Sequence, residues 1–62
     1  SRREKQCLAM AARGLTSADI GNKLGITDRG ANFHFGNILS KLAALNRNEA
    51  IAKAITLGLI SL

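Results

Sequence analysis

The stretch TSADIGNKLGITDRGANFHFGNILSKL, residues 16–42, decides the fold. Its first part predicts a helix of about two turns, which Thr16 or Ser17 caps and Gly25 ends. A short connection, Gly25-Ile26-Thr27, leads into a longer helix for which Thr27 is the cap. Two helices joined by a short turn that contains glycine form a helix-turn-helix unit. Each helix has apolar residues at helical spacing: Ile20 and Leu24 in the first, and Ala31, Phe35, Ile38 and Leu42 in the second.

The segments on either side carry the same kind of helix signal. Each has a capping residue, a glutamate three residues later and a terminating glycine: Ser1, Glu4 and Gly14 for a first helix, and Asn46, Glu49 and Gly58 for a last one. Their apolar positions are Leu8, Ala11 and Ala12, and Ala50, Ala54 and Leu57. Proline and strand-type alternation are both absent from the sequence. The sequence therefore predicts an all-α fold, a small four-helix domain that contains a helix-turn-helix.

Length and residue usage exclude several classes of protein. The chain has 62 residues, one cysteine and one histidine, Cys7 and His34. A domain this small holds no enzyme-sized cleft, and these two residues allow neither an internal disulfide nor a zinc site. No apolar run is long enough for a membrane span. We therefore expect one domain over residues 1–62, no enzyme, no metal, no cofactor, no membrane and a cytoplasmic location.

Charge gives the first indication of a partner. Nine Lys and Arg against four Asp and Glu give a net charge of +5 and a pI near 10.4. Such an excess is typical of a surface that binds polyanions, although it also fits ordinary solubility. Phe33 and Phe35 are the only aromatics, which is too few for a platform on which single-stranded bases stack. Double-stranded DNA is the favoured partner.

These residues resemble the LuxR-type helix-turn-helix DNA-binding domain over essentially the whole chain. The first half matches at Arg3-Glu4, Gly14, Thr16-Ser17, Asp19-Ile20 and Leu24-Gly25-Ile26. The second half matches at Asn32-Phe33-His34, Asn37-Ile38, Lys41-Leu42, Asn46-Arg47, Ala50, Lys53-Ala54 and Gly58-Leu59-Ile60. The Asn-Phe-His segment is more similar to the branch that responds to acyl-homoserine lactones in quorum sensing than to the response-regulator branch.

The resemblance implies an architecture and a set of partners. A tri-helical core is followed by a C-terminal dimerisation helix, and the third helix enters the major groove. Such domains normally follow a sensor or receiver domain, so we expect the C-terminal part of a longer transcription regulator. The expected partners are double-stranded DNA, a second copy of the chain bound through the fourth helix, and RNA polymerase as a further candidate.

The resemblance also implies site residues. Bases would be contacted by Asn32, Phe33 and Gly36, but Gly36 has no side chain to read a base, so we expect Arg29 and Asn37 to contribute as well. The expected phosphate contacts are Thr16, Ser17, Lys41 and Arg47, and the expected dimer contacts are Asn48, Ile51, Ala52 and Ile55. Arg47 opposes the dipole of the helix it begins, which favours a separate purpose such as phosphate binding.

Two glycines in the third predicted helix, Gly30 and Gly36, are compatible with a second function. Family members usually have Thr-Val where this chain has Gly30-Ala31, and glycine there favours fraying of the third helix at its start. With Gly36, this departure is compatible with a protein-interaction or dimerisation module that has lost base reading. We further expect His34 to be partly buried, Cys7 to be a semi-buried apolar residue and Phe33 to point away from the core.

Overall fold

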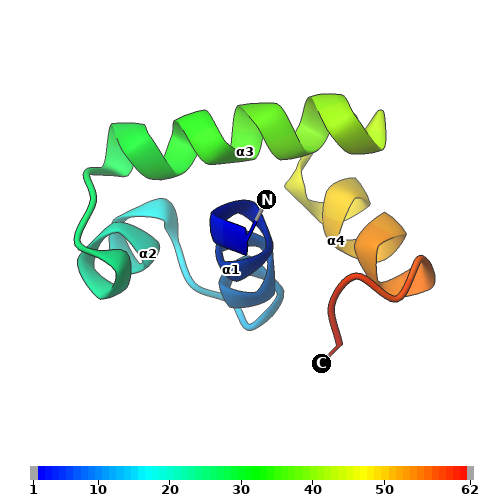
Figure 1. Ribbon diagram of the computed structural model, residues 1–62, viewed down its shortest axis with the longest axis horizontal. Coiled ribbons are helices and arrows are strands. Elements are labelled where there is room, and N and C mark those ends of the chain that lie inside the picture. The colour runs from blue at the N-terminus through cyan, green and yellow to red at the C-terminus, as the bar shows by residue number, and fades with distance from the viewer. Residues whose placement is uncertain (1, 62) are drawn as a thin grey trace.

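The computed structural model describes residues 2–61 and shows four helices, α1 (Arg2–Ala12), α2 (Ser17–Leu24), α3 (Asp28–Leu42) and α4 (Arg47–Thr56) (Figure 1). In this view α3 runs across the top, with α1 beneath its middle, α2 beneath its N-terminal end and α4 beneath its C-terminal end. No strand occurs in residues 2–61, so the all-α prediction is confirmed. The predicted cap Ser1 lies outside the described residues. Within the same range, no helix combines the length and apolar character needed to cross a membrane.

Every helix contributes to a single core. The buried apolar residues are Cys7 and Leu8 from α1, Ile20 from α2, Ala31, Phe35 and Ile38 from α3, and Ala50 and Ala54 from α4. Leu24 and Leu42 are partly buried and pack against this core, so the predicted apolar faces of α2 and α3 are confirmed. Cys7 is more deeply buried than expected, and its burial raises the pKa of the thiol. Leu57 is the C-cap of α4, which ends at Thr56, and its side chain is exposed, so it does not belong to the core as its spacing from Ala50 and Ala54 predicted.

The junction between α2 and α3 combines predicted caps with a close approach. Thr16 and Thr27 are the N-caps of the two helices, and Gly25 ends α2 with a φ of 71°. Gly21, inside α2, is buried and accepts a hydrogen bond of 2.9 Å from the Ile26 N–H. A Cβ at Gly21 would lie 2.7 Å from the Ile26 carbonyl oxygen. The turn can therefore pack this closely against α2 only because residue 21 has no side chain.

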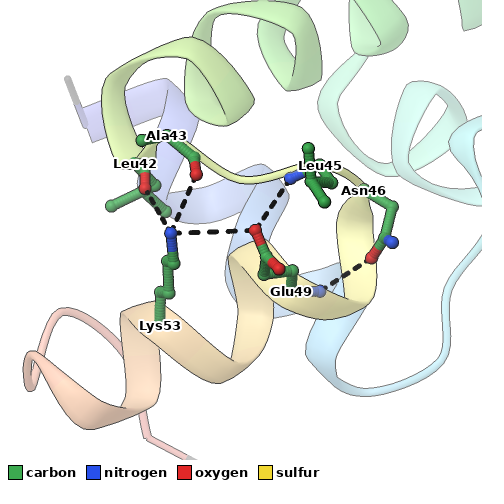
Figure 2. A network of polar contacts seen from close by, with 6 residues as sticks. All are labelled: Leu42, Ala43, Leu45, Asn46, Glu49 and Lys53. Carbon is green, nitrogen blue, oxygen red and sulfur yellow. Dashed lines mark hydrogen bonds and ion pairs between the residues drawn. The ribbon is translucent and has the colours of Figure 1, made fainter.

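A lysine from α4 covers the C-terminal end of α3 (Figure 2). Ala43 caps α3 in the left-handed conformation, with a φ of 52° that is unusual for a residue other than glycine. Lys53 Nζ donates to the carbonyl oxygens of Leu42 at 3.2 Å and of Ala43 at 2.8 Å. An ammonium group at the negative end of a helix is electrostatically favourable. Lys53 thus links the end of α3 to α4.

The start of α4 is tied to the same loop (Figure 2). The Asn46 side chain accepts the Glu49 N–H at 2.9 Å, which confirms Asn46 as the cap. The Glu49 carboxylate accepts the N–H of Leu45 at 2.9 Å and lies 3.7 Å from Lys53 Nζ. These bonds fix how α4 leaves α3, and so where Arg47, the first residue of α4, is placed.

Candidate nucleic-acid interface

One face of α3 is turned away from the core and is open to solvent. Its exposed residues are Arg29, Asn32, Phe33, Gly36, Ser40 and Lys41, with Asn37 half-buried at the edge. Phe33 is 68% exposed although it is a large apolar residue, whereas Phe35 is 2% exposed. The expected separation of the two phenylalanines is therefore confirmed. The only acidic residue of α3 is Asp28, in its first turn, so most of this face carries no negative charge.

Three of the predicted contact residues form one hydrogen-bonded cluster, although they come from three helices. Ser17 Oγ of α2 donates to Asn32 Oδ1 of α3 at 2.7 Å. Arg47 Nη2 of α4 donates to the same Asn32 oxygen at 2.8 Å and also to Ser17 Oγ. The Arg47 guanidinium carbon lies 3.9 Å from the centroid of the Phe35 ring, a cation–π contact. Arg47 therefore joins the exposed face of α3 to the start of α2.

Thr16 lies beside this cluster at the start of α2. Its hydroxyl accepts the Asp19 N–H at 3.1 Å, and the Asp19 carboxylate accepts the Thr16 N–H at 3.1 Å. Hydrogen bonding to Thr16 holds the pKa of Asp19 below its ordinary value, and the backbone of Thr16 contributes more to this than its side chain does. Of the two predicted caps, Thr16 is therefore the one that caps α2; it forms a capping box with Asp19 and stays exposed.

Lys41 lies apart from the cluster, in the last turn of α3. Its Nζ donates to Glu4 Oε1 of α1 at 2.8 Å, and its side chain remains 62% exposed. This hydrogen bond lowers the pKa of Glu4, whose side chain is only 12% exposed. The ion pair connects residues 37 positions apart in the chain, so no local sequence pattern predicts it.

The predicted dimer residues lie on the outer side of α4, with one exception. Asn48, Ala52 and Ile55 are exposed, and Ile55 is 38% exposed. Ile51 is partly buried and packs against the core, so it belongs only in part to the outer surface. Leu57 and Leu59 were not among the predicted dimer residues, but they follow α4 directly and are 65% and 40% exposed.

Two other residues singled out from the sequence have ordinary surroundings. His34 is partly buried, as expected, and its ring meets that of Phe33 edge-on with centroids 6.2 Å apart. Gly30 lies within regular helix, because α3 is helical from Asp28 and the Gly30 N–H donates to the Thr27 hydroxyl at 2.9 Å. Residues 2–61 contain no cluster of three or more His, Cys, Asp or Glu side chains that could hold a metal ion.

The match to a family model settles what kind of domain this is. The model described as bacterial regulatory proteins, luxR family, matches residues 1–54. The chain belongs to the LuxR family. Since this family consists of regulatory proteins, the prediction of a regulator rather than an enzyme is confirmed.

Individual relatives of this LuxR-family domain agree. The chain is 47% identical over 58 residues to the transcriptional activator protein SolR of Ralstonia nicotianae, covering 94% of this chain and 25% of SolR. It is 45% identical over 60 residues to the transcriptional activator protein LuxR of Aliivibrio fischeri, covering 97% of this chain and 24% of that protein. A putative HTH-type transcriptional regulator of Sinorhizobium fredii, y4qH, is 45% identical over 62 residues, which are 19% of its length. The chain thus spans a quarter or less of the length of these relatives.

Proposed function

We propose that this LuxR-family domain binds double-stranded DNA in a sequence-specific manner, with the exposed face of α3 in the major groove. The observation that carries the proposal is that face, which presents Arg29, Asn32 and the exposed Phe33 on one side of a helix whose other side is core. The major groove admits an α-helix and displays a distinct pattern of donors, acceptors and methyl groups for each base pair.

The residues of this face suit different parts of the groove. Arg29, Asn32 and Asn37 supply donors for base edges, and Phe33 is suited to a thymine methyl group. A Cβ at Gly36 would meet nothing within 4 Å, so the helix surface is open there. Without a side chain at Gly36 the α3 backbone can approach the bases closely.

Phosphate groups would be held beside the groove. Thr16 and Ser17 lie at the start of α2, where the helix dipole favours an anion. Lys41 and Arg47 add positive charge from α3 and α4. Affinity that rests on such contacts falls steeply with salt, because neutralised phosphates release counterions.

The whole regulator is part of the same proposal. The chain would form the C-terminal output domain of a longer cytoplasmic quorum-sensing regulator that binds DNA as a dimer and contacts RNA polymerase. SolR and LuxR are both named as transcriptional activators, and the chain covers about a quarter of each. Two copies joined through α4 would bind a pseudo-palindromic site with half-sites about one helical turn apart.

The dimer is tested by sedimentation velocity over a range of protein concentrations. Ile55→Lys places a charge on the exposed apolar part of α4 and should shift the chain to monomer. Leu45→Lys is the matched control, because Leu45 is 87% exposed in the loop before α4. Equal self-association of the two variants would contradict a dimer built on Ile55.

DNA binding is tested by fluorescence anisotropy with duplexes selected from a randomised pool and with scrambled duplexes, across a salt series. We expect affinity for both to fall with salt and the selected duplex to be preferred. Arg29→Gln should reduce that preference. Arg2→Gln is the control and should leave the preference unchanged, because it removes the same charge from α1, at a hollow that Leu59 and Ile60 also line. Absence of binding at low salt would contradict the proposal.

The competing function, an interaction module without base reading, makes a different prediction for Gly36→Lys. The surroundings of Gly36 in the free domain are open enough for a lysine. If α3 docks on the duplex, the flexible lysine stem can carry the ammonium aside from the bases to a phosphate, which should raise DNA affinity. Gly30 is less suitable for such a test, because a Cβ there would lie 3.3 Å from the Thr27 capping oxygen. An unchanged affinity for DNA would favour the interaction module.

A further inference from the structure

We infer that Ser17 and Arg47 orient the Asn32 amide so that only its N–H donors face outward, which makes guanine rather than adenine the base that Asn32 reads. This inference rests on the proposed function. It adds the identity of one base and assigns Ser17 and Arg47 as positioning residues.

The orientation of the amide follows from the chemistry of its neighbours. A guanidinium group has donors and no acceptor, so the Asn32 atom that faces Arg47 at 2.8 Å must be the carbonyl oxygen. The Ser17 hydroxyl donates to the same oxygen at 2.7 Å. An amide oxygen has two lone pairs, and these two donors occupy both.

The two partners are themselves held in place. Arg47 stacks on Phe35, which is part of the core, and Ser17 is the first residue of α2. Turning the amide by half a rotation would bring its NH₂ group against the Arg47 N–H, donor against donor. Asn32 therefore keeps its oxygen toward the protein and its NH₂ group toward solvent.

The fixed orientation of the Asn32 amide determines which base it can recognise. An asparagine recognises adenine by donating to N7 and accepting from the N6 amino group, which requires a free oxygen. Asn32 has no free oxygen, and its two N–H groups match guanine, whose N7 and O6 are both acceptors. Adenine would place its amino group against a second donor.

The test begins with duplexes selected by this chain and by Asn32→Ala, an exposed position whose loss leaves the core intact. We expect each half-site to contain one guanine whose selection disappears in Asn32→Ala. Replacing it with 7-deazaguanine, which lacks the N7 acceptor, or exchanging its pair for adenine–thymine should each lower wild-type affinity about 5- to 150-fold. Neither replacement should affect Asn32→Ala.

Positioning is tested with Ser17→Ala and its conservative counterpart Ser17→Thr. Ser17→Ala frees one lone pair on Asn32 and should reduce the ratio of guanine to adenine affinity, while Ser17→Thr should restore it. A uniform loss of affinity with an unchanged ratio would contradict the positioning role, because it is the expected result for a phosphate contact alone.

The remaining outcomes distinguish failure of this inference from failure of the proposed function. Selection of adenine at the Asn32-dependent position, or salt-dependent binding with no Asn32-dependent guanine, overturns this inference and leaves the proposed function standing. Failure to bind any duplex at low salt overturns both.

Discussion

Gly21 and Gly36 lie in the middle of successive helices, yet they mark two different regions of the molecule. Gly21 is buried at the α2–α3 junction, where an added Cβ would lie 2.7 Å from the Ile26 oxygen and 3.3 Å from the Thr27 carbonyl carbon. Gly36 is exposed on the outer face of α3, where an added Cβ meets nothing within 4 Å. The same residue thus closes one region by packing and leaves the other open for a partner.

The largest change in stability should come from adding a side chain at Gly21, in the packed region. Gly21→Ala forces the backbone of the turn away from α2 and should lower the free energy of unfolding by about 2–3 kcal/mol. In a domain of this size, that loss corresponds to roughly 10 °C or more in Tm, measurable by circular dichroism. An alanine that leaves Tm unchanged would show that the junction is not tightly packed.

A smaller effect is expected at Arg47, which connects the outer face of α3 to the start of α2. Arg47→Met keeps much of the apolar stem but loses the hydrogen bonds to Ser17 and Asn32 and the contact with the Phe35 ring. We expect a loss of about 1.5 kcal/mol in urea unfolding. Arg13→Met is the control, since this arginine is exposed. Equal losses in the two variants would mean that the cluster does not stabilise the fold.

The open region should respond to alanine in the opposite direction. Gly36→Ala adds helix propensity without a clash and should raise the free energy of unfolding by about 1 kcal/mol. Gly25→Ala is the contrasting variant: its surroundings are also empty, but its φ of 71° disfavours a side chain, so it should destabilise. Destabilisation by Gly36→Ala would contradict an open face at that position.

The smallest expected effect is on the stability of the domain at acidic pH. Hydrogen bonds from Thr16 lower the folded-state pKa of Asp19, and the hydrogen bond from Lys41 does the same for Glu4. A lowered folded pKa means that the stabilisation is complete above the unfolded pKa and is lost as pH falls through the folded pKa. We expect Tm to drop as the pH falls below about 4, the ordinary pKa range of Asp and Glu, and less steeply in a variant with both Asp19→Asn and Glu4→Gln. If Tm of that variant falls with pH as steeply as that of the wild type, other titrating groups cause the loss of stability.

Local signals predicted most of the fold. The caps Thr16, Thr27 and Asn46 and the terminator Gly25 act on groups within a few residues, so their positions in the sequence fix the helix bounds. The periodic apolar residues of α3, with Phe35 inside and Phe33 outside, likewise depend only on the turn of the helix.

Contacts between helices could not be predicted in the same way. The hydrogen bonds of Arg47 to Ser17 and Asn32, and the ion pair of Lys41 with Glu4, depend on how the helices cross. The sequence indicated that Arg47 opposes the dipole of α4, and the structure shows contacts to α2 and α3 that hold it there. Gly21 was missed because a glycine that admits a close backbone and a glycine on a surface look alike in sequence.

The most direct measurement of the central claim is a titration of the isotope-labelled chain with a selected duplex, followed by backbone amide chemical shifts. We expect the largest changes at Arg29, Asn32, Phe33 and Gly36 and at the start of α2, with small changes at Arg2 and Lys5 of α1. Changes confined to α4, with the outer face of α3 unaffected, would contradict docking of α3 on DNA.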